Sequence, residues 1–139
     1  MLAQHEFRIR TEAPGAHDFS EDVAAFVARS GIERGLLTLF VRHSSASLLV
    51  QENYDPDVMA DMERFFRRLV PPGDPLFRHT AEGPDDMPAH VRSALTQTSL
   101  AIPVSEGKMV LGTWQGIWLY EHRDGPHDRR IFAHLQGES

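Results

Sequence analysis

The last third of the chain restricts the fold most, because its apolar residues recur at every second position. The runs 100–104 and 131–135 alternate strictly, and 117–122 places Ile117 and Leu119 on one face. A period of two is typical of half-buried β-strands. The tight turn at 105–108 joins antiparallel neighbours. We therefore predict a C-terminal antiparallel meander.

The first two thirds alternate between strand-like and helix-like segments. The predicted elements, in chain order, are strand 4–12, helix 18–30, strand 35–42, strand 47–51, helix 55–69 and helix 86–98. Pro14 and Gly15 are interpreted as a break after the first strand, and Asp18 as the start of the first helix. The apolar stripes of the first two helices suit core or subunit contacts. In the third helix, the inward residues are expected to be Val91, Ala94, Leu95 and Thr98.

This order of elements predicts an α+β fold with a mainly antiparallel sheet and about three helices. The 139 residues contain no linker or internal repeat, so we expect a single domain over 1–139. Twenty acidic against fourteen basic residues argue against nucleic-acid binding. No segment is apolar enough to cross a membrane or to act as a secretory leader, so we expect a cytoplasmic protein without a membrane partner.

The chain has eight histidines and no cysteine. Disulfides, thiolate chemistry and cysteine-bound zinc are therefore excluded, and a metal can be held only by histidine, aspartate or glutamate.

Two segments concentrate histidine beside polar groups. His43 closes a predicted strand and is followed by small hydroxyl residues, which suits either a functional imidazole or a histidine that caps a carbonyl. The segment from His79 to His90 adds Glu82 and two aspartates and is either a site or a solvated acidic loop. His43, His79 and His90 together can form a three-histidine metal site with an open position. They contain no HExxH spacing, so only the fold can bring them together.

Two further segments suit ligand recognition. The run from Gly112 to Gly116 places Trp114 and Gln115 between glycines, which fits either a planar heterocycle or a core tryptophan beside a bulge. The segment 121–130 carries arginines and two histidines, His122 and His127, which suits a phosphate or a hydrophilic hairpin loop.

Several of these motifs occur together in a characteristic order. They are His43-Ser44-Ser45-Ala46, Glu52-Asn53 before an Asp-Pro helix start, His79, Glu82-Gly83, Ala89-His90 and Gly112-Thr113-Trp114-Gln115-Gly116. In this combination the chain resembles the YjbQ-like family, over about Phe7 to Gly137. Two departures are the serines Ser44 and Ser45, where many members have threonines, and a longer run before His90. The second leaves open whether Asp85 or Asp86 takes the equivalent role.

The resemblance implies a compact α+β homotrimer with sites near subunit contacts. Members of the family are described as secondary thiamine-phosphate synthases, which couple hydroxymethylpyrimidine diphosphate to a thiazole phosphate and release diphosphate. The implied catalytic residues are His43, His79, Glu82 and His90, with the three histidines as ligands of a divalent metal, magnesium or zinc. The implied substrate-binding residues are Asn53, Thr113, Trp114, Gln115, Glu121 and Arg130. A small phosphorylated heterocycle is then the expected partner.

In this interpretation the metal, Arg130 and the histidines neutralise the departing diphosphate. Trp114 stacks on a substrate ring, and Glu82 or a histidine moves a proton. The alternative is a trimer that binds a metal or a small anion without turnover.

Overall fold

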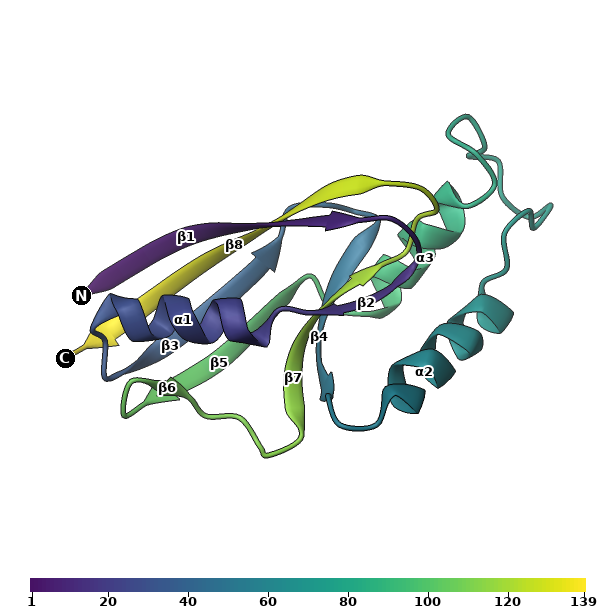
Figure 1. Cartoon of the computed structure of the whole chain (residues 1–139). Coiled ribbons are helices and arrows are strands. Elements are labelled where there is room, and N and C mark those ends of the chain that lie inside the picture. The colour runs from purple at the N-terminus through teal and green to yellow at the C-terminus, as the bar shows by residue number, and fades with distance from the viewer.

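The computed structural model describes all residues from 1 to 139. The elements, in chain order, are β1 (Leu2–Thr11), β2 (Gly15–Asp18), α1 (Ser20–Ser30), β3 (Arg34–Val41), β4 (Ala46–Glu52), α2 (Pro56–Leu69), α3 (Asp86–Leu95), β5 (Ser99–Ser105), β6 (Lys108–Met109), β7 (Gln115–Glu121) and β8 (His127–Glu138) (Figure 1). Three helices and antiparallel strand pairs confirm the predicted fold class.

The strands form two sheets. The larger has the order β1-β8-β3-β5-β6, and the smaller has the order β2-β7-β4. The links β1–β2, β3–β4 and β7–β8 each carry the chain from one sheet into the other. These three links lie at the same end of the larger sheet, and His43 lies in the β3–β4 link.

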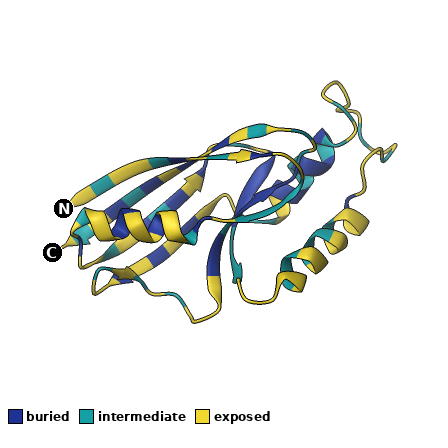
Figure 2. Ribbon diagram, in the orientation of Figure 1, coloured by how far each residue is buried: buried dark blue, intermediate teal, exposed yellow.

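The hydrophobic core lies between the larger sheet and α1 (Figure 2). Leu48 and Leu119 of the smaller sheet also belong to it. α1 contributes Val23, Phe26 and Val27, which form the apolar stripe of this helix. The alternating residues of β5 and β8 are buried, as expected for strands with one face toward a core. The opposite face of the larger sheet leaves Phe40 and Phe132 exposed, directly across from each other in register.

β2 corrects the prediction for residues 14–18. This segment was interpreted as a break and a helix start, but Gly15 has a φ of +139° and the chain then pairs with β7. The first helix starts at Ser20, and the Asp18 carboxylate accepts hydrogen bonds from the Ser20 N–H at 2.9 Å and its hydroxyl at 2.6 Å. Pairing with a strand about a hundred residues away is a tertiary effect that local turn signals do not contain.

The inward face of α3 is also different from the prediction, which was wrong here. Leu95 is 58% exposed, and Ala94 and Thr98 are exposed as well. The buried residues of this helix are instead Asp86, Pro88, Ala89, Arg92 and Ser93. The physical reason is that α3 packs on the protein through hydrogen bonds and ion pairs, which an apolar periodicity does not reveal.

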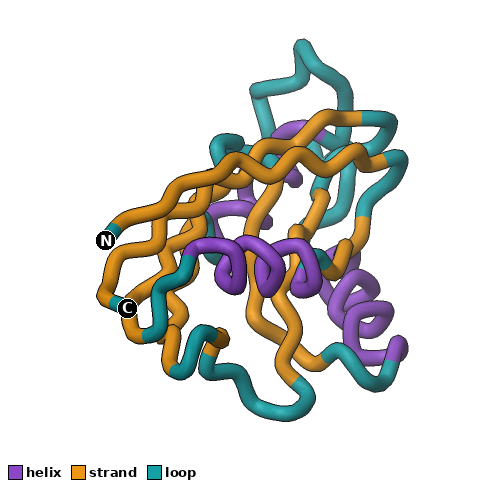
Figure 3. The backbone as a smooth tube through the Cα atoms, turned by 60° about the vertical axis from the view of Figure 1, so that its left-hand side comes forward, coloured by secondary structure: helices purple, strands orange, loops and turns teal.

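α2 lies at the periphery of the molecule (Figure 3). None of its residues is buried. Its polar connection to the rest of the chain is Glu63, whose carboxylate accepts a hydrogen bond of 2.5 Å from the Tyr120 hydroxyl and pairs with Arg92 at 3.2 Å. Phe66 packs edge-on against the Tyr120 ring. None of the helices is both long and apolar enough to cross a membrane.

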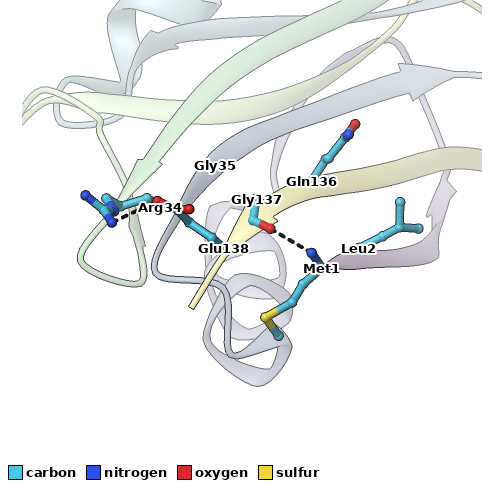
Figure 4. Close-up of a pocket in the computed structure, with 7 residues that line it drawn as sticks. All are labelled: Met1, Leu2, Arg34, Gly35, Gln136, Gly137 and Glu138. Carbon is cyan, nitrogen blue, oxygen red and sulfur yellow. Dashed lines mark hydrogen bonds and ion pairs between the residues drawn. The ribbon is translucent and has the colours of Figure 1, made fainter.

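The two ends of the chain meet at one end of the larger sheet, where β1 and β3 begin and β8 finishes (Figure 4). The Met1 ammonium donates to the Gly137 carbonyl at 2.8 Å, and Arg34 pairs with Glu138 at 2.8 Å. The surface cavity between them contains none of the predicted site residues.

Candidate functional site

α3 is fixed over the start of β4 by side-chain contacts to the β4 backbone and the segment before it. The Ser93 hydroxyl donates to the Ala46 carbonyl at 3.0 Å, and His90 Nδ1 lies 2.8 Å from the Ser44 carbonyl. These contacts place the first turns of α3 beside the polar segment that follows β3.

Three side chains converge at the N-terminal end of α3. Asp86 and His90 lie one turn apart on one helix face, and His79 reaches them from the preceding loop. The Nε2 atom of His79 lies 2.7 Å from Asp86 Oδ2, and that of His90 lies 3.1 Å from the same oxygen. One potential ligand atom from each of the three residues lies within 4.8 Å of the others. We call this group the His-Asp-His cluster.

The Asp86 side chain is buried, and a nearby guanidinium stabilises its negative charge. Its Oδ1 atom lies 3.2 Å from Arg123 Nη1. Burial raises the pKa of Asp86, but the hydrogen bond with the His79 side chain and the charges of His90 and Arg123 outweigh it, so the pKa is lowered. The carboxylate is therefore ionised and available as a ligand at neutral pH.

The structure separates the roles of the two neighbouring aspartates. Asp85 points to Arg123 Nε at 3.1 Å and accepts the Asp124 N–H at 2.9 Å. Asp85 therefore orients Arg123, whereas Asp86 belongs to the His-Asp-His cluster. The spacing of Asp86 and His90 by four residues is the sequence signal that could have identified this pair.

The position of protons in this cluster is restricted by the Ser44 carbonyl, which can only accept. His90 Nδ1 must therefore carry a hydrogen, and a neutral His90 ring has no second hydrogen to place on Nε2. Two acceptors, His90 Nε2 and Asp86 Oδ2, then face each other at 3.1 Å. A cation relieves this contact, either a proton on His90 or a metal ion bound by both atoms.

The donor set fits a metal ion in other respects too. Ligand atoms around tetrahedral zinc lie about 3.3 Å apart, given bonds of about 2.0–2.1 Å, and the His90–Asp86 distance is close to this value. The Ser44 carbonyl on Nδ1 is the kind of outer contact that orients metal-binding histidines. His79 also lines a cavity of about 310 Å³, which leaves room for a ligand beside the cluster.

His43 does not join this cluster within one chain. Its Nε2 atom accepts the Arg130 N–H at 2.9 Å, and it lines a separate, open cavity of about 570 Å³ with Arg42 and the hydroxyl residues Ser44 and Ser45. Burial, followed by the charge of Arg129, lowers the pKa of His43. A neutral imidazole with hydroxyls and an arginine beside it suits an anion.

Glu121 is completely buried in an ion pair with Arg129. Its carboxylate also accepts hydrogen bonds from the Thr11 hydroxyl at 2.5 Å and from the backbone N–H groups of His122 and Arg123. Burial raises its pKa, but these partners lower it further than burial raises it. Every oxygen has a protein partner, so this carboxylate holds β7 to β8.

The remaining charged predicted residues are on the surface. The side chain of Arg130 is exposed, across the sheet from Arg8. Glu82 is exposed, and its carbonyl accepts Arg123 Nη2 at 2.9 Å. His122, in contrast, is buried, with Nε2 at 2.8 Å from the Ser47 hydroxyl.

The predicted ring-binding residues gather at the other end of β4. The Asn53 N–H donates to the Trp114 carbonyl at 2.8 Å, and the Gln115 side chain accepts the Gly112 N–H at 2.8 Å. Trp114 is 55% exposed, and Tyr54, which sequence reasoning missed, is 72% exposed with its ring 4.7 Å from that of Trp114. Thr113 is exposed beside them. Two tilted, accessible aromatic rings suit a planar ligand.

The two groups of predicted residues are far apart within one chain. His90 contacts Ser44, two residues before β4 begins, and Asn53 follows the last residue of β4. The six residue steps of this strand span about 20 Å at about 3.3 Å each. One small ligand cannot contact both groups of the same chain.

Comparison with known proteins gives one consistent result. The family model described as UPF0047 protein YjbQ-like matches residues 5–138. A UPF0047 protein of Synechocystis, sll1880, is 52% identical over 94% of this chain and 88% of its own length. The UPF0047 protein YjbQ of Escherichia coli O157:H7 is 45% identical over 99% of this chain and 100% of its own.

Solved structures agree. The hypothetical protein APE1520 of Aeropyrum pernix superposes with a TM-score of 0.89 at 31% identity, over 98% of this chain and 99% of that one. An uncharacterised protein of the same family from Clostridium acetobutylicum gives 0.87 at 34% identity, over 95% and 99%. The chain therefore belongs to the UPF0047, YjbQ-like family, whose function these relatives leave uncharacterised.

Proposed function

We propose that this protein binds a divalent cation through the His-Asp-His cluster and acts on a phosphorylated heterocycle in a thiamine-phosphate synthase-type transfer. The observation that carries the metal site is the pair of facing acceptors, His90 Nε2 and Asp86 Oδ2. Two imidazoles favour zinc over magnesium, which prefers oxygen ligands. The choice of reaction rests on the family resemblance and on the chemistry of the two residue groups.

In the proposed reaction, the bond between the pyrimidine methylene carbon and the diphosphate oxygen breaks. The thiazole nitrogen forms the new bond to that carbon with its own electron pair, and diphosphate leaves with the electrons of the broken bond. A bound divalent cation supplies charge neutralisation to the phosphate oxygens. Arg42, His43 and the hydroxyls of Ser44 and Ser45 line an open cavity that suits the same anion, with Arg130 beside it.

Glu82, in the loop beside the His-Asp-His cluster, is proposed to move a proton near the leaving diphosphate. Trp114, with Tyr54, is proposed to stack on a substrate ring, while Asn53, Thr113 and Gln115 offer polar groups at its edge. Glu121, in this account, serves the site by holding β7 of the smaller sheet to β8 of the larger sheet.

The distance between the two groups supports the homotrimer that the resemblance implies. Because β4 separates them by about 20 Å, they can serve one substrate only if different copies of the chain contribute them. The exposed pair Phe40 and Phe132 and the unburied helix α2 are surfaces that a second copy can cover.

The direct test is thiamine-phosphate formation by His79→Ala and His90→Ala, assayed with zinc or magnesium. Both variants are expected to lose activity and to keep the oligomeric state of the wild type. His134→Ala is the matched control, because His134 contacts Gln4 on the sheet and lies outside the cluster. Unchanged product formation in both cluster variants would overturn the proposal.

Subunit mixing tests the shared site. His90→Ala and Trp114→Ala chains are each expected to be inactive as pure oligomers. When the two are unfolded and refolded together, some sites combine an intact cluster with an intact tryptophan, and activity returns. Mixed oligomers that form without any recovery would contradict a site shared between copies.

A second candidate is a trimer that binds a metal or small anion without turnover. The observation that favours it is the same separation, since a metal cluster without a neighbouring ring-binding surface is complete in itself. Calorimetric titration with zinc, magnesium and inorganic diphosphate, run beside the transfer assay, distinguishes the two. Tight binding with no turnover supports this candidate.

A further inference from the structure

A second polar cavity lies beside α3, between this helix, the end of α2 and the segment after β7. Its walls are three prolines and the charged or titratable residues Arg67, Asp85, Arg92, His122 and Asp124. Its volume is about 20 Å³, which is enough for one water molecule and too little for a phosphate group. None of the catalytic, substrate-binding or metal-binding residues that the family resemblance implies lines it.

Two buried polar atoms of the residues in its wall have no protein partner. They are Arg92 Nε and His122 Nδ1. The other nitrogens of Arg92 are used, because Nη1 binds Glu63 at 3.2 Å and Nη2 donates to the Val70 carbonyl at 3.4 Å. Buried polar groups are almost always paired, with the protein or with ordered water, so two orphans at one cavity indicate an occupant.

The hydrogen on His122 can be assigned from its neighbour. Burial lowers the pKa of His122 to about 3, so the ring is neutral and carries one hydrogen. The Ser47 hydroxyl is buried, makes no other hydrogen bond, and lies 2.8 Å from His122 Nε2. Ser47 satisfies its hydrogen only by donating to Nε2, which leaves the ring hydrogen on Nδ1.

Besides the Arg67 guanidinium, the residues that line the cavity therefore supply two unpaired donors and two carboxylate acceptors. The donors are Arg92 Nε–H and His122 Nδ1–H, and the acceptors are the carboxylates of Asp85 and Asp124. A water molecule accepts two hydrogen bonds and donates two, whereas a halide ion only accepts and cannot donate to the carboxylates of Asp85 and Asp124. We propose that this cavity is a binding site for a single ordered water that joins Arg92 and His122 to the acidic residues at the start of α3.

Such a water also supports the contacts that hold the His-Asp-His cluster at the start of α3. Asp85 binds Arg123, which also binds Asp86 of the His-Asp-His cluster. A water anchored on Arg92 and His122 therefore supports the loop and helix end that present the cluster. Arg92 and His122 act here as positioning residues.

The test is a crystal structure of the full chain at a resolution that shows ordered water, with a second crystal soaked in bromide. The expected result is one density peak at about 2.7–3.2 Å from Arg92 Nε and from His122 Nδ1, without anomalous signal in bromide. An Arg92→Lys crystal, which keeps the charge beside Glu63 but lacks Nε–H, is expected to lose the peak. Arg67→Lys is the control that keeps it.

A bromide peak at this position would replace the water with a halide site, and the absence of any peak would overturn the proposal. Nitrogen-15 chemical shifts of the His122 ring provide an independent check that needs no variant. The expected spectrum has the hydrogen on Nδ1, and a hydrogen on Nε2 contradicts the proposed arrangement of donors.

Discussion

Glu121 and Asp86 are both buried carboxylates with lowered pKa values, but their partners are of different kinds. Glu121 is surrounded by donors that are always present: a guanidinium, a hydroxyl and two backbone N–H groups. Asp86 faces one guanidinium and two imidazoles, which can lose a hydrogen and accept a metal instead.

The comparison shows that burial alone does not identify a functional carboxylate. Permanent donors on both oxygens of Glu121 leave no position for a ligand, so its contribution is to stability. The two imidazoles beside Asp86 can bind a metal ion together with its carboxylate, so Asp86 can act as a ligand. The type of partner therefore separates the structural group from the candidate ligand.

The largest effect is expected for Glu121→Leu, which leaves Arg129 buried without its counter-charge. The free energy of unfolding should fall by about 3–5 kcal/mol, measured by urea denaturation. Arg129→Leu should be similarly harmful, while the double variant should be clearly less destabilised than the sum of the two. Additive losses would mean that the two residues do not act as a pair.

Asp86→Asn should lower zinc affinity by at least about 100-fold, more than is usual for groups that only orient a ligand. The loss of unfolding free energy should be smaller than that of Glu121→Leu, because uncharged asparagine leaves Arg123 with Asp85 as a partner. Calorimetric zinc titration measures the affinity. Asp124→Asn, an exposed carboxylate nearby, is the control and should bind zinc as the wild type does.

His122, the buried residue that follows Glu121 in the chain, makes the stability of the protein depend on pH. Its pKa is about 3 in the folded protein and 6.5 for an ordinary histidine. Between these values the unfolded chain binds a proton that the folded chain does not, so stability falls as the pH is lowered. From pH 7 to pH 5 the loss is about 2 kcal/mol.

Urea denaturation of wild type and His122→Gln at both pH values checks this. The variant lacks the titrating ring, so its loss over the same interval should be about 2 kcal/mol smaller. Parallel losses in the two proteins would show that His122 titrates normally in the folded state.

The smallest effect is expected at an exposed carboxylate. Asp55 accepts the Asp57 N–H at 2.9 Å and caps α2. Asp55→Ala should cost about 1 kcal/mol, and Asp55→Asn, which keeps an accepting oxygen, should cost less. Equal unfolding free energies for the alanine variant and the wild type would show that the Asp55 cap does not stabilise α2.

The fold class was predictable because its signals are local. Alternation in β5 and β8 predicted buried strands, and Asp55 with Pro56 predicted the start of α2. β2 was missed because its pairing with β7 is long-range. The buried face of α3 was missed because it is polar, and the spacing of apolar residues cannot reveal a face that is buried through ion pairs.

For the site, the sequence indicated which histidines take part more reliably than it indicated which groups each histidine contacts. His79 and His90 do meet, but with Asp86, while His43 binds the Arg130 N–H instead. Composition cannot distinguish these outcomes, since each depends on which backbone carbonyl or N–H the fold places beside an imidazole. Tyr54 carried no motif, and only its contact with Trp114 marks it.

The central claim is the metal site in the His-Asp-His cluster, and anomalous diffraction from zinc-soaked crystals tests it most directly. The account predicts one strong zinc peak bonded to His79 Nε2, Asp86 Oδ2 and His90 Nε2, and no such peak in Asp86→Asn crystals. A zinc peak on other residues, or none on this cluster at neutral pH, would contradict it.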